Sequence, residues 1–577
     1  MEKRDIWSSQ KGTMGRFFSL LWKARLPYLW ILGYIVVSIA LTNVGVSVTE
    51  YTAEMYAGNV SFTGVILPFL TVTVISLIIS SISGVVSGLC EARIDRNLRR
   101  VVWKKAVRLP FSYYQENAPK ELISRVTTDI TTISSLIMQV FLSAVTSLYA
   151  TLRLFAQISS YNPRLTLATL LLLPVHIVLP VIVGRLQFGL NDKVNRSTAE
   201  LTEGLSERTG QSMLIKSFSA QEKERRGIGQ RIRALYRATI QSSWVTNLYS
   251  PVYTLVNVLQ FILLVMVGRG FYASGEISLA QWVAYYAFAN QIVNRLAAYA
   301  GYWRSLKASQ GATRRVADVV AEEEEDRSSG ETVQDLSGDI VLEHVEFSYG
   351  DKPLFRDLSL TIPQGRATAV IGRSGSGKTS LLNLLERFYE PQAGDIRIGG
   401  DSILKFSKES YRGALTYVTQ ESTMLSGTIR ENLLYGVRRE VDERELDQVC
   451  EQVNIKDYID SLPEGYEAQV GEDGSRLSGG QKQKIAAARG MLKHTKYFLM
   501  DEGTAAMDAE AKDAVWDGVS RLMRGRTTVY VAHDRQTVLK ADYVIVMDQG
   551  AVTAFGPLEE VYQTSAYLRE LVGEGGI

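Results

Sequence analysis

Cysteine is scarce in this sequence: only Cys90 and Cys450 occur among its 577 residues. Two cysteines cannot build a disulfide framework, and both thiols are compatible with a reducing compartment. Excess charge is also missing, because the formal net charge is only +2. A nucleic-acid partner would require a clustered basic face, so no nucleic acid is expected as a partner.

The chain divides into two unlike halves. A single hydrophobic core stops growing near roughly 250 to 300 residues, so this length predicts at least two domains. Long apolar runs lie before about residue 305, and motifs typical of nucleotide binding lie after about residue 340. The stretch "VVAEEEEDRSSGETVQDLSGD" between them has the composition of a linker. We predict a transmembrane domain over 1–320, a linker over 321–338 and a nucleotide-binding domain over 339–577.

Six apolar runs in the first half are long enough to cross a membrane, which takes about 20 residues per helix. They are 28–48, 62–89, 130–158, 165–186, 249–267 and the more polar 277–300. The first run is expected to be a span because it is too long for a cleaved signal peptide and no small-residue cleavage pattern follows it. Too few residues are expected before it for an additional peptidase domain.

Basic residues set the expected orientation. They are frequent before the first run and after the second, whereas the connection "EYTAEMYAGNVSF" contains no Lys or Arg. Cytoplasmic connections favour Lys and Arg, so both termini are expected in the cytoplasm of a multi-pass protein. A half-size chain without a transit peptide best fits a bacterial cytoplasmic membrane. The connections 91–129 and 191–241 are charged yet helical in pattern, so they are expected to continue the membrane helices into the cytosol.

Polar side chains at membrane depth are costly and are candidates for function. Two interpretations stay open: the side chains pair with one another inside the bundle, or those of the sixth run line a wet cavity for an amphipathic cargo. The candidates are Arg153, His176, Asn290, Gln291, Asn294 and Arg295, with Tyr285, Tyr286, Tyr299 and Tyr302 nearby.

A phosphate-binding loop begins the list of motifs in the second half. "GRSGSGKT", residues 372–379, fits the pattern G-x-x-x-x-G-K-[ST] between the strand-like "ATAVI" and the helix-like "SLLNLLERF". Its glycines let backbone N–H groups surround phosphate oxygens at a helix N-terminus. Lys378 is expected to reach the β- and γ-phosphates, and Thr379 to ligate Mg²⁺. The candidate phosphate-binding residues are Gly372, Ser374, Gly375, Ser376, Gly377, Lys378, Thr379 and Ser380.

Two further strand patterns end in residues suited to phosphate chemistry. "KYFLMDEG" ends in Asp501, expected to hold Mg²⁺, and Glu502, expected to polarise the attacking water. "TTVYVAHD" ends near His533, which is expected to contact the γ-phosphate. In "RLSGGQKQKIAAARGML", Ser478, Gly479, Gly480 and Gln481 precede a helical run and predict a second anion-binding helix N-terminus.

With these motifs the chain resembles a half-transporter of the ATP-binding cassette superfamily, over essentially its whole length. The resemblance implies that Tyr349 stacks on adenine, that Gln420 senses Mg²⁺ and the membrane domain, and that "DEGTAAMD" ends at Asp508 near a dimer interface. Family members commonly carry "DEATSALD" there, so contacts near Asp508 are expected to differ. The implied fold is an all-α six-helix transmembrane domain with an α/β P-loop ATPase domain.

The resemblance further implies a head-to-tail dimer, each ATP lying between one chain's phosphate loop and the other chain's "LSGGQ". The segments "FSYYQENAPKELISRVTTDI" and "ERTGQSMLIKSFSAQEKE" resemble the coupling segments of the exporter type. The leading function is ATP-driven export of an amphipathic peptide, drug-like compound or lipid, with ATP and Mg²⁺ as cofactors. Two alternatives stay open, an importer of a metal chelate and an ATP-gated channel or sensor. Partners are membrane lipids, the substrate, and a second copy or a related half-transporter.

Overall fold

The chain forms two compact units in a computed structural model, which describes residues 22, 25–58, 61–419, 422–501, 523 and 525–573. One unit comprises Met1–Arg108 and Asn117–Glu322, and the other comprises Leu109–Glu116 and Glu323–Ile577. The segment Leu109–Glu116 lies within the predicted membrane domain in sequence, yet its contacts place it with the C-terminal unit. This stretch overlaps the segment "FSYYQENAPKELISRVTTDI", which resembles a coupling segment, although the predicted domain boundaries assign it to the membrane domain.

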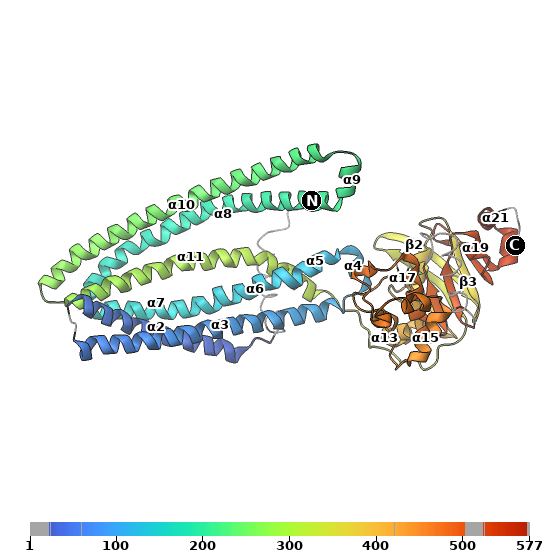
Figure 1. The fold of residues 1–577 in the computed structure, drawn as a ribbon, viewed down its shortest axis with the longest axis horizontal. Helices are drawn as coiled ribbons and strands as arrows, with labels where there is room; N and C mark the ends of the chain where they lie inside the picture. Colours follow the sequence, from blue (N-terminus) through green and yellow to red (C-terminus); the bar gives the residue numbers. More distant parts are fainter. Residues whose placement is uncertain are drawn as a thin grey trace. The chain divides into compact units, whose positions relative to one another are not determined.

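The N-terminal unit is helical throughout its described elements, and Figure 1 shows its long helices running side by side. They are α2 (Tyr28–Tyr56), η1 (Phe62–Ile66), α3 (Leu67–Ala106), α5 (Pro119–Ser124), η2 (Arg125–Asp129), α6 (Ile130–Leu136), η3 (Ile137–Leu142), α7 (Ser143–Tyr161), α8 (Pro163–Gly210), α9 (Ser212–Ser217), α10 (Gln221–Ala273) and α11 (Leu279–Ala321). Helix α10 packs against α8, and α2 packs against α3. Helix α11 packs against α2, α7 and α8.

Local capping explains where two of these helices begin. The Asn162 side-chain oxygen accepts hydrogen bonds from the backbone N–H groups of Arg164 and Leu165, both at 3.0 Å, directly before Pro163 at the first position of α8. Ser278 and Gln281 form a reciprocal capping box at the start of α11. Strong caps at these turns separate α7 from α8 and α10 from α11.

The predicted helical continuation of the membrane helices over 191–241 is present in α8 and α10, which Ser212–Ser217 of α9 separates. These helices contain 48 and 53 residues, about 72 and 80 Å at 1.5 Å per residue, whereas a bilayer core measures about 30 Å. Among the described residues, four helical segments are long and apolar enough to span a membrane: Tyr28–Tyr56, Phe62–Ala106, Glu121–Tyr161 and Gln221–Ala273. The predicted spans 165–186 and 277–300 lie in α8 and α11 and stay predictions as spans.

The C-terminal unit contains two sheets. The strands are β1 (Ile340–Tyr349), β2 (Lys352–Ile362), β3 (Ala367–Gly372), β4 (Ala393–Ile398), β5 (Asp401–Ser402), β6 (Leu415–Val418), β7 (Tyr497–Met500), β8 (Thr527–Val531), β9 (Tyr543–Asp548) and β10 (Ala551–Pro557). A four-stranded sheet has the order β2-β1-β4-β5, and a six-stranded sheet has the order β10-β9-β3-β8-β7-β6. Strands β9, β3, β8, β7 and β6 are parallel, and β10 pairs antiparallel with β9.

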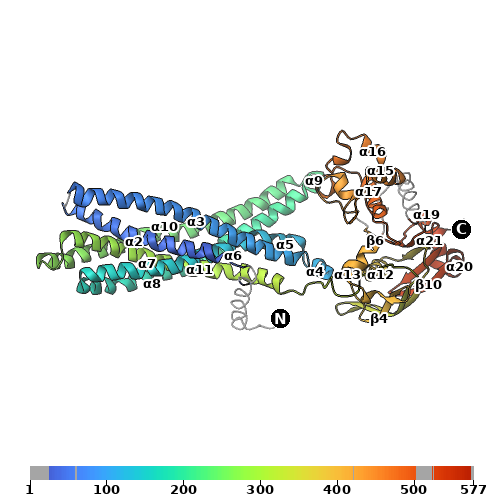
Figure 2. The ribbon, with the colours of Figure 1, turned by 90° about the horizontal axis from the view of Figure 1, so that it is seen from below.

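Helices surround these sheets. They are α4 (Phe111–Glu116), α12 (Lys378–Leu385), η4 (Ile403–Lys405), α13 (Lys408–Gly413), α14 (Ile429–Leu433), α15 (Glu443–Gln452), α16 (Lys456–Asp460), η5 (Gly465–Glu467), η6 (Glu472–Gly474), α17 (Gly479–Leu492), α19 (Arg535–Val538), α20 (Leu558–Thr564) and α21 (Ala566–Val572). Figure 2 shows α15, α16 and α17 gathered apart from strands β4 and β10.

The central strand β3 is buried on both faces. Ala369 and Ile371 belong to one hydrophobic cluster, and Val370, whose side chain points the opposite way, belongs to the other. All three are fully buried, which is why "ATAVI" reads as a continuous apolar run instead of an alternating one. The predicted fold class, a helical membrane domain joined to an α/β ATPase domain, is confirmed.

Candidate nucleotide-binding site

The sheet order gathers the predicted nucleotide residues at one edge. Strands β3, β8, β7 and β6 are neighbours and run parallel, so their carboxyl ends lie together. The phosphate loop follows β3, His533 follows β8 and Asp501 follows β7. Neighbouring strands lie about 4.8 Å apart, so β3 and β7, with β8 between them, are separated by about 10 Å. This edge of the sheet can hold a nucleoside triphosphate and its metal ion.

Glycine is required at two positions of the loop. Gly372 has φ +151°, and a Cβ atom there would lie 2.1 Å from the carbonyl oxygen of Met547. Gly377, directly before α12, has φ +106°, and its Cβ would lie 2.8 Å from the ring of Phe355. A side chain at either position would therefore force the loop away from the neighbouring chain. The glycines of the motif are needed here for packing as well as for contact with phosphate.

Lys378 lies inside the loop. Its ammonium group donates hydrogen bonds of 2.9 Å to the carbonyl oxygens of Gly372 and Arg373, and the side chain is 6% exposed. The loop thus surrounds a cation beside the N-terminus of α12, an arrangement that attracts phosphate. The Ser376 hydroxyl is buried and has no hydrogen-bond partner among the described residues, so it can still form a hydrogen bond with a ligand in the loop.

The residues predicted to hold Mg²⁺ supply suitable ligands. Thr379 is exposed at the first turn of α12, and Asp501 is 7% exposed directly after β7. The Asp501 backbone N–H donates to the carbonyl of Val418, 3.0 Å away, which anchors this carboxylate beside β6. A hydroxyl and a carboxylate with phosphate oxygens and water form the oxygen set that Mg²⁺ prefers. Within the described residues no cluster of three or more His, Cys, Asp or Glu side chains could bind a metal by itself.

Tyr349 lies next to the loop at the end of β1. Its hydroxyl donates a 3.0 Å hydrogen bond to Ser380, the third residue of α12. Its ring meets Phe347 and Tyr389 edge to face, with centroids 4.8 and 5.1 Å apart. The side chain is therefore held at the border of the phosphate loop by contacts on two sides.

The second predicted anion site begins α17. Ser478 accepts a hydrogen bond from the Gln481 backbone N–H at 3.3 Å, and the Gln481 side chain accepts one from the Ser478 backbone at 2.7 Å. This capping box fixes the first turn of the helix. Ser478 and Gly479 are exposed, so the helix N-terminus faces solvent in the single chain.

Three predicted site residues, Gln420, Glu502 and Asp508, lie outside the described residues. Their roles stay predictions. The roles assigned to Tyr349, His533 and the LSGGQ residues also depend on a bound nucleotide and remain predictions.

The short helix α4 contacts the C-terminal unit through aromatic side chains. The rings of Phe111 and Phe388 stack with centroids 4.7 Å apart, and Phe111 meets Tyr389 edge to face at 6.1 Å. The Tyr389 hydroxyl donates a hydrogen bond to the Gln115 side chain. Burial raises the pKa of Tyr389 to about 12, with a further contribution from Glu116 and Tyr349, so the hydroxyl stays protonated and donates.

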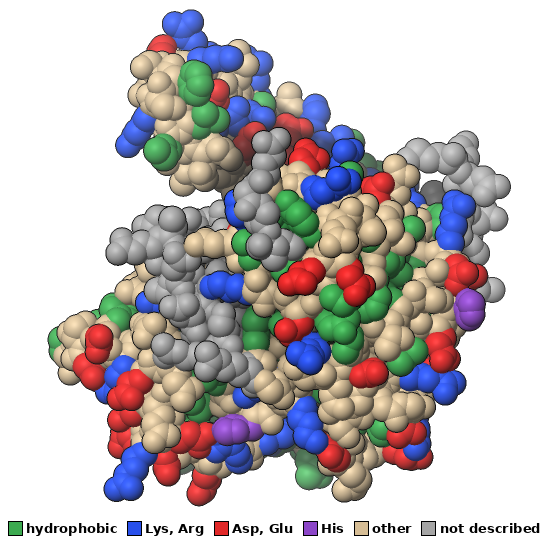
Figure 3. All heavy atoms as spheres, turned by 90° about the vertical axis from the view of Figure 1, so that its right-hand side faces the viewer, with side chains coloured by type: hydrophobic (Ala, Val, Ile, Leu, Met, Phe, Trp, Pro, Cys, Tyr) green, Lys and Arg blue, Asp and Glu red, His purple; other side chains and the backbone are tan. Residues whose placement is uncertain are grey.

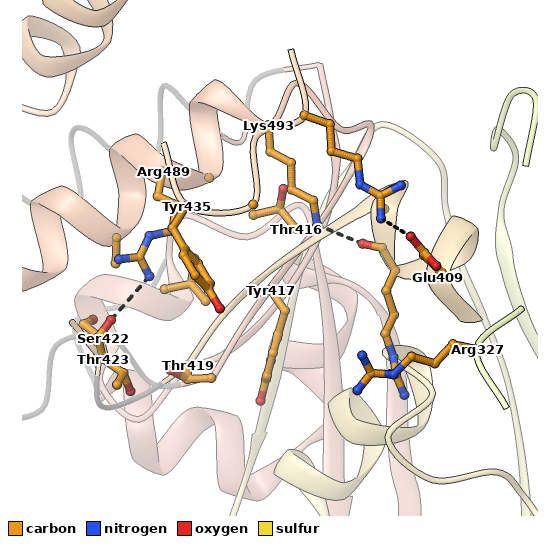
Figure 4. Close-up of a pocket in the computed structure, with 17 residues that line it drawn as sticks. Arg327, Glu409, Thr416, Tyr417, Thr419, Ser422, Thr423, Tyr435, Arg489 and Lys493 are labelled. Carbon is orange, nitrogen blue, oxygen red and sulfur yellow. Dashed lines mark hydrogen bonds and ion pairs between the residues drawn. The ribbon is translucent and has the colours of Figure 1, made fainter. Parts of the chain in front are cut away.

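The C-terminal unit also contains a basic cavity that the sequence did not predict. It has a volume of about 710 Å³ and lies beside the end of β6 and the C-terminal half of α17. Figure 4 shows Arg327, Arg489 and Lys493 around it, with the ring of Tyr417 between them. Glu409 is the one carboxylate among its described lining residues. These residues come from separate elements and share no motif, so no sequence signal could have indicated the cavity.

Elsewhere charges of both signs are mixed. On the face drawn in Figure 3, Lys and Arg side chains alternate with Asp and Glu side chains.

Several polar residues of the membrane unit pair with one another. Arg153 donates to the Gln157 side-chain oxygen at 2.6 Å, and Gln157 donates to Glu50 at 2.5 Å. Asn294 donates to Asn290 at 3.0 Å, and Gln291 donates to Thr49 at 3.4 Å. Tyr285 hydrogen-bonds with Thr169, 2.7 Å away, and Tyr299 and Tyr302 meet edge to face. Arg153 and Tyr285 thus have polar partners inside the bundle, whereas Gln291 and Asn294 have partners and also line a cavity, so both interpretations stay open for the sixth run.

Two candidates behave differently. His176 is buried, and neither ring nitrogen has a hydrogen-bond partner among the described residues. Arg295 forms no ion pair with any described residue and lines a cavity in the membrane unit.

Comparisons with known proteins cover both units. Residues 29–296 match the family described as "ABC transporter transmembrane region", and residues 355–505 match the family described as "ABC transporter". A "Multidrug resistance ABC transporter ATP-binding and permease protein" of Lactococcus lactis is 30% identical over 98% of this chain and 96% of its own length. A "Fatty acid ABC transporter ATP-binding/permease protein" of Mycobacterium tuberculosis is 31% identical over 80% of this chain and 73% of its own length.

A solved structure supports the fold. The ATP-bound structure of a bacterial Atm1-family ABC exporter superposes with a TM-score of 0.79, covering 94% of this chain and 98% of that one at 21% sequence identity. Together with the phosphate loop, the parallel sheet and the helical membrane unit, these matches identify the chain as a member of the ABC transporter family, whose ATPase domain binds ATP and couples its hydrolysis to transport across a membrane.

Proposed function

We propose that two copies of this chain form the working transporter, with each ATP held between the phosphate loop of one copy and the LSGGQ segment of the other. The observation that carries this proposal is the exposed helix N-terminus at Ser478 and Gly479, separate from the phosphate loop. The phosphate loop is expected to bind the phosphates of its own chain's nucleotide. A second anion-binding N-terminus gains a ligand when another copy presents its nucleotide.

The residues of the composite site have distinct roles in this proposal. Lys378 binds the β- and γ-phosphates, Tyr349 stacks on adenine, and Ser478 with the neighbouring glycine amides contacts the γ-phosphate from the other copy. Glu502 orients and polarises the attacking water, while His533 and Gln420 contact the γ-phosphate region. Thr379, Asp501 and Gln420 hold Mg²⁺, which, when bound, neutralises charge on the phosphate oxygens.

Coupling between ATP and the membrane unit is proposed to pass through α4. Tyr389 contacts Tyr349, the proposed adenine partner, and also contacts Phe111 and Gln115 of α4. A change at the nucleotide therefore reaches, through two side-chain contacts, a segment that is continuous in sequence with α3 and α5. At the other connection, α9 and the turn after it expose Met213 and Phe218 at 85% and 76%. We infer that the nucleotide-binding domain of the second copy covers these apolar side chains.

The substrate is proposed to be amphipathic and to move outward by alternating access. Relatives are named for multidrug resistance and for fatty acids, and an "ATP-dependent lipid A-core flippase" of Thiobacillus denitrificans is 26% identical over 81% of each chain. Molecules of these kinds join an apolar part to a polar part. The location proposed is a bacterial cytoplasmic membrane, with both chain termini in the cytoplasm.

The test is the ATPase rate of the full chain, purified alone into lipid nanodiscs, with the Glu502→Gln protein as blank. The wild-type ATPase rate should exceed that of the blank and should rise when an amphipathic compound is added. Crosslinking of Cys residues placed at Ser374 and Gly479, in the same nanodiscs with ATP, should join two copies. Absent turnover together with absent crosslinking would reject the self-sufficient homodimer and direct the search to a partner half-transporter.

A further inference from the structure

A cavity of about 570 Å³ lies inside the membrane unit among α2, α3, α7 and α11. Eleven of its fifteen described lining residues are polar. They include Tyr34, Ser83, Ser147, Gln291, Asn294 and Arg295. The volume falls within the range of small-molecule binding sites, and polar groups at membrane depth mark functional cavities.

Arg295 is the one charged residue among the described residues of this wall. It is half-buried and forms no ion pair with any described residue. Arg153 in the same bundle provides a contrast, because Gln157 links it to the carboxylate of Glu50. Arg153 is thus linked to a carboxylate within the bundle, whereas Arg295 faces a cavity with no carboxylate among its described lining residues.

Two amide side chains of the wall add hydrogen-bond donors to the guanidinium of Arg295. Gln291 donates one amide N–H to Thr49 and Asn294 donates one to Asn290, so each amide keeps a second N–H. With the guanidinium of Arg295, these amide groups can donate several hydrogen bonds at once. Such a set recognises an anion such as a carboxylate, sulfonate or phosphate.

Apolar side chains complete the wall. Leu41 of α2, Leu154 of α7 and Ala298 of α11 line the same cavity. We propose that this cavity binds the anionic group of an amphipathic substrate, that Arg295 is its counter-ion, and that the hydrocarbon part of the substrate lies against Leu41 and Leu154. This proposal rests on the proposed function and adds the charge of the cargo to it.

The test compares two fluorescent probes that share a twelve-carbon chain, one ending in a sulfonate and one in a quaternary ammonium. Binding is measured by fluorescence anisotropy on the full-length protein in nanodiscs of phosphatidylcholine, with empty nanodiscs subtracted. The sulfonate probe should bind more tightly than the ammonium probe. Arg295→Gln should weaken sulfonate binding about tenfold or more, the effect of losing a charge-assisted hydrogen bond. Arg295→Lys should restore most of the affinity because it keeps the charge.

Arg153→Gln is the matched control, since it removes a cation of the same bundle that does not line the cavity. It should leave the preference for sulfonate over ammonium unchanged. The proposal is overturned if the ammonium probe binds more tightly to the wild type, or if Arg295→Gln binds the sulfonate probe as tightly as the wild type does.

A further arm identifies the source of the anion. In nanodiscs containing phosphatidylglycerol, competition with the sulfonate probe would show that a membrane lipid supplies the headgroup, and undiminished probe binding would show that a soluble amphiphile does. The ATPase rate of the same samples separates the two proposals. Turnover stimulated only by the ammonium probe would reject the anionic cargo and leave ATP-driven transport standing. Tight sulfonate binding without any turnover would support the anionic site and reject ATP-driven transport by this chain alone.

Discussion

The ring of Tyr389 meets the ring of Tyr349 edge to face, with centroids 5.1 Å apart and planes at 85°. Through its hydroxyl, Tyr389 also holds Gln115 of α4. Residues 389 and 115 are 274 positions apart, so only the folded chain brings them together. The relationship joins the border of the phosphate loop to a helix whose neighbours in sequence belong to the membrane unit.

Phe111→Ala should weaken coupling while sparing the nucleotide site. Phe111 stacks on Phe388 and contacts Tyr389, and aromatic pairs of this kind contribute about 0.5–1.5 kcal/mol beyond their burial. In nanodiscs, substrate-stimulated ATP hydrolysis should fall severalfold, and ATP affinity should remain near that of the wild type. Tyr389→Phe is the milder comparison because it removes only the hydrogen bond to Gln115. Equal stimulation in wild type and Phe111→Ala would contradict a role of α4 in coupling.

Lys378→Ala should weaken ATP binding itself. The ammonium group lies inside the loop, and its removal takes away the charge that meets the phosphates. Affinity for a fluorescent ATP analogue should drop about tenfold or more, as expected for loss of a charged hydrogen bond. Lys223→Ala, at an exposed lysine of α10, serves as control and should bind ATP normally. Glu502→Gln should also bind ATP normally but stop turnover, so the two motif residues separate binding from hydrolysis.

Arg315→Gln should destabilise the membrane unit. Arg315 of α11 donates two hydrogen bonds, of 2.8 and 2.6 Å, to the carboxylate of Asp129, which is 5% exposed. Removing the arginine leaves a buried carboxylate without its partner, at a cost of about 1–3 kcal/mol. The melting temperature in detergent should fall, and adding Asp129→Asn should recover part of the loss.

An exposed ion pair provides the control for that measurement. Arg196 and Asp192 of α8 are 2.9 Å apart with side chains 73% and 59% exposed. Exposed pairs contribute about 0–1 kcal/mol, so Arg196→Gln should leave the melting temperature nearly unchanged. A similar decrease in melting temperature in both variants would show that the burial of Asp129 does not make its ion pair more stabilising than an exposed one.

Glu386 should make stability depend on pH. Burial raises the pKa of this carboxyl, which follows α12, from its usual value to about 7. The native state therefore holds a proton that the unfolded state has lost between about pH 4.5 and 7, so stability should fall as pH rises through this window. Glu386→Gln removes the titration and should flatten the dependence.

Melting temperatures of the two proteins at pH 5 and pH 8 test this expectation. At pH 5, where Glu386 is protonated, the proteins should melt alike. At pH 8, where the wild type carries a buried charge, the Gln variant should melt at the higher temperature. A parallel pH dependence in both would show that Glu386 does not titrate in this range.

Much of the nucleotide site could be predicted because its information is local. A phosphate loop needs a buried strand, left-handed backbone at glycine and a helix N-terminus, and all three lie within "ATAVIGRSGSGKTSLLNLL". The structure forms β3 and α12 on either side of that loop. The long helices could be predicted for the same reason, since apolar runs, helical patterns and few breakers are properties of neighbouring residues.

The sequence by itself thus determined the fold class, the family and the residues of the phosphate loop. Only the tertiary structure decided that Arg153 is paired while Arg295 faces a cavity, and that cations distant in sequence surround the basic cavity. Periodicity reports which face of a helix is apolar, but the partner of a polar side chain depends on which helices pack together. Contacts between residues far apart in the chain are set by packing of the whole unit, and no local pattern encodes them.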